Sequence, residues 1–449
     1  MARKGPGERS VPSRPSERLR IPQPLLRRRI PSGRGAMEQP NATGDGDAAL
    51  TPRVWVLVVA TGVATGLFGA FLMWVLFGMQ HLAFGDHNDQ LVAAVERSSN
   101  LRRVLSLTVA GVFGAIAWFL VRKFMPRQGT RVDDVVWNGG GELGFPRSFA
   151  TSVIQEVVIG LGASIGREAA PKLMGGVSGS LLGRWAGLTP SQRRLLIACG
   201  GGAGLTAVYN VPLAGALFTT EILLGSLTVP TVLPAVACSW IATVVSWLYL
   251  PDRATYLNIP AYHVSASLVT WAILVGPVVG LISVAFIRLV GWVSYRQLQG
   301  KAMLVAFPIA LCALGFLGIQ YPQLFGNGKD MAHAAFLGQG GLLLLFALFA
   351  LKPLVTTMCL GAGGSGGLLT PTLSTGAALG GFLGAAWTLL WPGSPVGAYA
   401  MVAAAAMMGA SLQAPLTALA LVLELTHAGF GIMVPMALAV VTATAVARY

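Results

Sequence analysis

Two glycine-rich stretches, one in each half of the chain, decide the fold. The first reads Gly162-Ala-Ser-Ile-Gly-Arg-Glu-Ala-Ala170 and the second reads Gly363-Gly-Ser-Gly-Gly-Leu-Leu-Thr-Pro371. Each interrupts an apolar segment and precedes a new helix in which glycine recurs every fourth residue. A helix that begins at such a break has free backbone N–H groups, which in lipid only a cavity or a ligand satisfies. Because the positive end of the helix dipole favours negative charge, both breaks predict an anion site.

The two halves of the chain also carry matching motifs around these breaks. Gly166 and Gly367, one in each break, are 201 positions apart, and a block further on repeats at an offset of 203. Two blocks at nearly one offset indicate an internal duplication, and duplicated halves with interrupted helices are typical of transport proteins. The other matched pairs are Gly175 and Gly376, Gly179 and Gly380, Gly183 and Gly384, Pro212 and Pro415, and Glu221 and Glu424.

The composition is that of a membrane protein. Apolar residues make up 54% of the chain and charged residues only 11%, against about 25% charged in soluble domains. Residues 353–423 contain no charged side chain, and a bilayer-spanning helix needs about 20 apolar residues. This pattern predicts an all-α polytopic membrane protein and excludes a soluble enzyme, a disordered chain and a disulfide scaffold. The longest spans are expected at 53–84, 101–125 and 264–297.

The charge is concentrated at the N-terminus. The net charge is +14, and residues 1–50 carry ten Lys and Arg against five Asp and Glu in a Pro- and Arg-rich tail without periodicity. This tail is expected to be disordered and cytoplasmic, and Met37 is an alternative start. The charge does not indicate nucleic-acid binding. The four scattered cysteines lack metal-ligand spacing, so neither a metal nor another cofactor is expected.

The motifs in and after the breaks resemble those of the CLC family of chloride channels and proton/chloride antiporters. Gly166-Arg-Glu168 is similar to the start of the family's Gly-Arg-Glu-Gly-Pro motif, and Gly367-Leu-Leu-Thr-Pro371 to its Gly-x-Phe-x-Pro motif. Pro212-Leu and Pro415-Leu resemble the family's two Pro-Leu helix starts. The resemblance covers about residues 51–449.

The resemblance implies a particular architecture. It implies two inverted-topology repeats of tilted and broken helices, at about 101–250 and 264–449, with the family's last helix beyond Tyr449. It also implies one pore per subunit, a homodimer and an integral, multi-pass location in the inner or plasma membrane of a bacterium.

The resemblance further assigns roles to residues. Glu168 is expected to be a gate whose carboxylate occupies an anion site and leaves when protonated. Thr130 is expected to replace the family's anion-coordinating serine, while Ile222 stands where coupled exchangers often carry an inner proton-accepting glutamate. The proton pathway would therefore include Glu168 but lack the usual inner acid. The expected anion-binding residues are Thr130, Gly166, Arg167, Gly367, Leu368, Leu369 and Thr370.

Several charged residues have two interpretations. Lys172 follows Glu168 by four residues and would either pair with it or raise the local positive potential. Arg167 would either contact the permeating anion or, as we favour, serve the structure. Glu221 and Glu424 are interpreted chiefly as buried carboxylates bound to backbone amides. The lone charges Glu156 and Lys352 are interpreted as capping or interfacial residues.

The predicted function is chloride or small-anion transport across the bilayer, with a channel of the voltage-gated type favoured. A proton-coupled chloride antiporter and a fluoride-selective relative are the alternatives within the family. An organic-solute transporter is a more distant one. An enzyme is not expected, although Ser365 and His427 fit the nucleophile and base of an intramembrane serine protease.

Overall fold

The structure is a computed structural model that describes residues 50–86, 90–125, 131–138 and 142–449, and residues 46–449 form one unit. The N-terminal tail and Thr130, both subjects of expectations above, lie outside the described residues.

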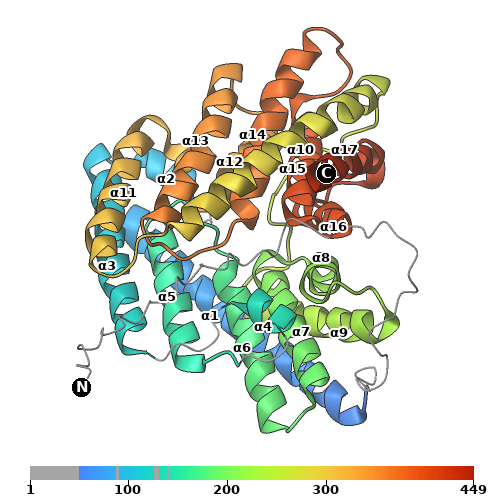
Figure 1. Ribbon diagram of the computed structural model, residues 1–449. Coiled ribbons are helices and arrows are strands. Elements are labelled where there is room, and N and C mark those ends of the chain that lie inside the picture. The colour runs from blue at the N-terminus through green and yellow to red at the C-terminus, as the bar shows by residue number, and fades with distance from the viewer. Residues whose placement is uncertain (1–49, 87–89, 126–130, 139–141) are drawn as a thin grey trace, which may run out of the picture. The chain divides into compact units, whose positions relative to one another are not determined.

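The described part of the chain is almost entirely helical (Figure 1). An isolated antiparallel bridge pairs Gly166 with Gly367. The helices of the first half are α1 (Pro52–Phe84), α2 (Leu91–Arg97), α3 (Asn100–Phe124), α4 (Val132–Asn138), α5 (Phe145–Gly160), α6 (Ala169–Trp185), α7 (Pro190–Tyr209), α8 (Pro212–Leu217), the π-helical η1 (Phe218–Leu224) and α9 (Val229–Ser246). Those of the second half are α10 (Ala266–Tyr295), α11 (Lys301–Gln320), η2 (Pro322–Leu324), α12 (Lys329–Phe336), α13 (Leu342–Gly361), α14 (Leu369–Thr388), α15 (Val396–Leu412), α16 (Pro415–Thr426), η3 (Phe430–Ile432) and α17 (Met433–Arg448).

Seven helices of the described residues are long and apolar enough to cross a membrane. They confirm the three long spans expected from the sequence, which correspond to α1, α3 and α10. The remaining four are α9, α11, α13 and the segment Phe430–Arg448 that contains α17.

The regularly spaced glycines let neighbouring helices approach closely. α6 packs on α7, and α14 packs on α15. A Cβ atom added at Gly175 or Gly179 of α6 would overlap the backbone of α7, and one at Gly380 of α14 would collide with α15. These helices therefore use small-residue packing of the kind found between membrane helices.

The matched glutamates Glu221 and Glu424 join the two halves of the unit. α8 lies beside α16, as Figure 1 shows. The Glu424 carboxylate accepts backbone N–H bonds from Leu213 and Ala214 at 3.0 and 2.7 Å. Reciprocally, Glu221 accepts from the N–H groups of Leu416 and Thr417 at 3.2 and 2.7 Å. Each carboxylate thus caps the start of the helix in the other half, a geometry that supports the structural interpretation.

Candidate anion site

The two glycine-rich breaks meet inside the unit. Gly166 and Gly367 exchange backbone hydrogen bonds, with N···O distances of 2.9 and 2.8 Å. Because α6 begins at Ala169 and α14 begins at Leu369, this pairing brings two helix N-termini together. A Cβ atom at Gly367 would overlap the Glu168 side chain, so a larger residue here would displace the carboxylate.

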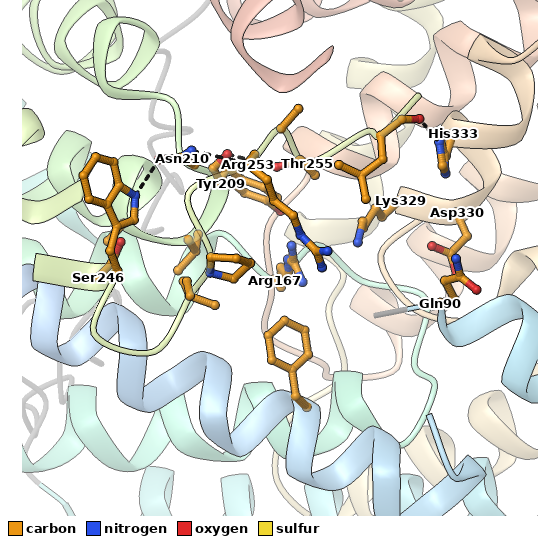
Figure 2. Close-up of a pocket in the computed structure, with 18 residues that line it drawn as sticks. Gln90, Arg167, Tyr209, Asn210, Ser246, Arg253, Thr255, Lys329, Asp330 and His333 are labelled. Carbon is orange, nitrogen blue, oxygen red and sulfur yellow. Dashed lines mark hydrogen bonds between the residues drawn. The ribbon is translucent and has the colours of Figure 1, made fainter. Parts of the chain in front are cut away.

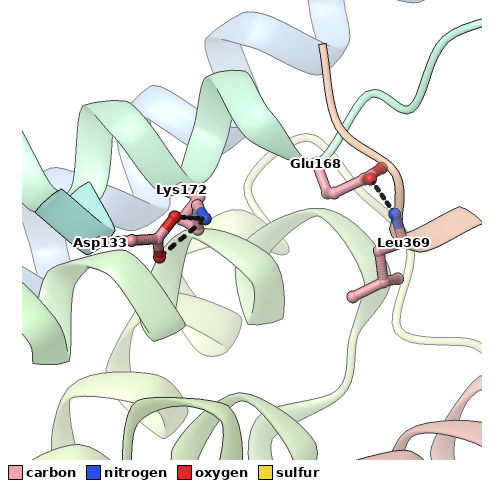
Figure 3. Close-up of polar contacts among 4 residues, drawn as sticks. All are labelled: Asp133, Glu168, Lys172 and Leu369. Atoms are coloured by element: carbon pink, nitrogen blue, oxygen red, sulfur yellow. Dashed lines mark hydrogen bonds and ion pairs between the residues drawn. The ribbon is translucent and has the colours of Figure 1, made fainter. Parts of the chain in front are cut away.

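Glu168 bridges the two helix starts. Its side chain is buried and extends away from its own helix toward α14 (Figure 3). Its Oε1 accepts the backbone N–H of Leu369 at 2.6 Å, and its Oε2 lies 3.3 Å from the Thr370 hydroxyl and 3.4 Å from the Tyr209 hydroxyl. The carboxylate therefore satisfies a free N–H group at the beginning of α14, where the helix dipole favours an anion.

The first interpretation of Lys172, a pair with Glu168, is wrong. Its ammonium instead contacts both carboxylate oxygens of Asp133 in α4, at 3.1 and 3.0 Å (Figure 3). The reason is geometric, because Glu168 precedes the first helical residue of α6 and its side chain points to α14 rather than along α6. Lys172 still adds positive charge near the start of α6.

A cavity lies next to the site and is lined by basic side chains. Arg167, Arg253 and Lys329 line it together with Tyr209 (Figure 2). The Arg167 guanidinium is buried and lies 5.0 Å from the centre of the Tyr209 ring. Tyr209 lines the cavity and its hydroxyl contacts Glu168, so its side chain connects the cavity to the site. The positive lining suits the approach of an anion.

Tyr209 was not singled out by the sequence. It ends α7, and its hydroxyl lies 2.7 Å from the Thr370 hydroxyl and 3.5 Å from Nδ2 of Asn327. An ordinary apolar segment ending in tyrosine gives no signal of such a contact, although its position directly before the Asn-x-Pro-Leu motif could have drawn attention to it.

The interpretation of Lys352 and Glu156 as capping or interfacial residues is wrong. Both side chains are fully buried. The Lys352 Nζ donates to the Ser164 hydroxyl at 2.8 Å and to the carbonyls of Gly326 and Leu324 at 2.9 and 3.4 Å. These three acceptors match the three protons of an ammonium group. Lys352 thereby joins the first break, through Ser164, to the Leu324–Gly326 segment.

The structure brings together most of the predicted anion-binding residues. Gly166, Arg167, Gly367, Leu369 and Thr370 all contact Glu168, neighbour it or belong to the bridge beside it. Leu368 directly precedes the first residue of α14. Ile222 lies in η1 and packs partly buried against the core.

The starts of α6 and α14 meet inside the protein, and the Glu168 carboxylate is bound between them. Together with the seven helices of the described residues that are long enough to cross a membrane, this arrangement is that of an integral, multi-pass membrane transport protein. A family model described as voltage gated chloride channel matches residues 113–448. A putative chloride channel protein ClcB-like from Ralstonia nicotianae is 31% identical over 78% of this chain and 84% of its own length. An H(+)/Cl(-) exchange transporter ClcA from Yersinia pseudotuberculosis is 26% identical over 89% of this chain and 85% of its own.

Solved structures agree with this fold. A slow cyanobacterial Cl-/H+ antiporter superposes with a TM-score of 0.76 at 24% identity, covering 89% of this chain and 95% of that one. A CLC-type fluoride/proton antiporter gives a TM-score of 0.70 at 20% identity, with coverages of 88% and 95%. The chain belongs to the CLC family, whose chloride-transporting members are named both as channels and as exchangers. It is an integral, multi-pass protein of a bacterial inner membrane.

Proposed function

We propose that this protein transports chloride through a pathway that the Glu168 carboxylate opens and closes. The observation that carries the proposal is the 2.6 Å hydrogen bond from the Leu369 N–H to the Glu168 carboxylate. A carboxylate in that position competes with chloride for the same helix N-terminus. When it is protonated, it loses its attraction to the helix start, and the anion takes its place.

The surrounding groups supply the remaining anion coordination. The backbone N–H groups of residues 167–168 and 368–370, with the Thr370 hydroxyl, form the site, whereas those of Gly166 and Gly367 are used in the bridge between the two breaks. Arg167 and the other basic side chains of the adjoining cavity concentrate anions at its mouth. We also place Thr130 in the pathway, on the family resemblance alone.

Within the family, we favour a channel over a coupled exchanger. The observation behind this preference is Ile222, which cannot bind a proton and lies beside Glu221 in η1. A proton-coupled chloride antiporter is the second candidate, because relatives of this chain carry that name. A fluoride-selective relative is a third. The reversal potential in a planar bilayer, under separate chloride, fluoride and proton gradients, distinguishes the three.

The decisive test of the gate is Glu168→Gln. The amide keeps the shape of the side chain but carries no charge at any pH, so chloride efflux from liposomes should be fast and nearly independent of pH. Glu142→Gln, which changes an exposed acid ion-paired with Arg184, is the matched control and should keep the wild-type profile. An E168Q protein with the wild-type pH profile would contradict the gating role.

We further propose a homodimer with one pathway per subunit. Besides the family resemblance, the support is the apolar pair Leu213 and Leu416, which occupy matching positions after the two prolines and are 47% and 46% exposed. Light scattering in detergent should give twice the protomer mass. Single-channel recordings should show two equal conductance levels. A monomer that conducts at the full rate would count against this interface, though not against the pathway.

A further inference from the structure

Glu156 is a second buried acid near the site. It lies in α5, four residues before the helix ends at Gly160, and its side chain is fully buried. Neither of its carboxylate oxygens has a hydrogen-bond partner among the described residues. Glu221 and Glu424, in contrast, each accept two backbone N–H bonds. An ionised carboxylate without such bonds costs several kcal/mol in a membrane interior, whereas a neutral carboxylic acid costs far less.

Glu156 is also coupled to the site by charge and by structure. The charges that act on it are Arg167, which attracts its carboxylate, and Glu168, which repels it. The neighbouring Gln155 donates from Nε2 to the carbonyl of Gly166 at 3.3 Å, so the end of α5 is fastened to the break itself.

Other charged groups of the packed helices are engaged elsewhere. α5 packs against α1, α3 and α6. On α3, Arg102, Arg103 and Arg122 donate to backbone carbonyls, and Lys123 lies over the rings of Phe119 and Phe124. On α6, Lys172 pairs with Asp133, and Arg184 pairs with Glu142. On α5 itself, Arg147 contacts the carbonyl of Met125. On α1, the charged or titratable residues are Arg53 in its first turn and His81 in its last. Arg167 and Glu168 therefore dominate the electrostatics at Glu156.

We propose that Glu156 is a second proton-binding residue, which shares a proton with Glu168 and so sets the pH at which the gate opens. The inference rests on the proposed gating function of Glu168. Two buried acids that repel each other in a medium of low dielectric constant do not ionise independently, because ionising one raises the cost of ionising the other. Binding one proton to either acid relieves this repulsion. While Glu156 is ionised it repels the Glu168 carboxylate, and Glu168 therefore takes up its proton at a higher pH than it would alone.

The experiment is the pH profile of chloride efflux from liposomes for the wild type, Glu156→Gln and Glu156→Leu. Leucine is included because it needs no hydrogen bond and fits a buried, unpartnered position should the glutamine variant fail to fold. In both variants the midpoint of the profile should move to lower pH by about one unit, and the profile should show a single titration step. Glu156→Asp should retain two steps, and E142Q should match the wild type.

Two outcomes would overturn the proposal. One is an E156Q or E156L profile that superposes on the wild type, which would mean that Glu156 is neutral throughout. The other is an infrared spectrum of the wild type that matches that of E156L. The proposal expects the wild type to show an additional carboxylic-acid C=O band that titrates with pH, and absence of this band refutes proton binding at Glu156. If wild-type liposomes pass no chloride, the proposed function fails, and the infrared result still decides the role of Glu156.

Discussion

Removing one hydroxyl group, by Tyr209→Phe, should weaken the closed state of the gate. The Tyr209 hydroxyl lies 3.4 Å from the Glu168 carboxylate and 2.7 Å from the Thr370 hydroxyl, which itself lies 3.3 Å from that carboxylate. The two hydroxyls thus form a small network that holds Glu168 against α14. Phenylalanine keeps the ring on which the Arg167 guanidinium lies, so the change isolates the hydroxyl.

The magnitude follows from the distances at Tyr209. A hydrogen bond to a charged group contributes about 1.5–3 kcal/mol. The distance from the Tyr209 hydroxyl to Glu168 exceeds the usual 2.5–3.0 Å of a strong O–H···O bond, and in the variant the Thr370 hydroxyl is free to donate to Glu168 alone. The loss should therefore be close to the lower limit, about 1.4 kcal/mol, which corresponds to a roughly tenfold shift toward the open state.

The assay is chloride efflux from liposomes as a function of pH. At a pH where Glu168 is ionised and the proposed gate is closed, Y209F should conduct up to about ten times faster than the wild type. At acidic pH the two rates should converge, because Glu168 is then neutral in both proteins. Tyr262→Phe is the matched control, since it removes a buried hydroxyl that donates to the carbonyl of Phe336 at 2.6 Å, away from Glu168. A Y209F rate equal to the wild type at every pH, or raised equally at every pH, would refute the reasoning.

Two further predictions concern coupling and stability. A chloride gradient at controlled voltage should drive little proton movement in fixed ratio, because Ile222 binds no proton. Ile222→Glu should introduce coupling, and tight coupling in the wild type would mean that another acid, such as Glu156, replaces the missing one. Glu424→Gln should lower the melting temperature, because one neutral carbonyl replaces the two charged oxygens that cap Leu213 and Ala214, a loss of about 1–3 kcal/mol. Unchanged melting in E424Q would show that this cap is not needed.

The sequence predicts the local features of the site well, because these depend on backbone conformation. Glycine breaks, Pro-Leu helix starts and the spacing between matched blocks all come from short-range rules. They correctly indicate that a helix starts after each break. The internal offset relates Gly166 to Gly367, but only the structure shows that the two residues are hydrogen-bonded to each other.

The sequence does not predict contacts that link distant segments through side chains. Lys352 reaches Ser164, 188 positions away, and Tyr209 reaches Thr370, 161 positions away. Lys172 shows the same limit at short range, since an i, i+4 spacing predicts a pair only where both side chains lie along one helix. Glu168 precedes its helix and turns toward another, so Lys172 pairs with Asp133 instead.

The buried Lys352 accounts for why protonation of Glu168 should admit an anion in particular. Its ammonium is held by one hydroxyl and two carbonyls, which are all neutral, so its charge is not cancelled by its immediate partners. While the Glu168 carboxylate is ionised, it opposes the positive potential of the helix start whose Leu369 N–H it accepts. Once Glu168 is neutral, the ammonium and the two helix starts leave the site with a positive potential. An anion is then attracted to the site, whereas a cation is repelled, so the open state of the proposed gate should select anions.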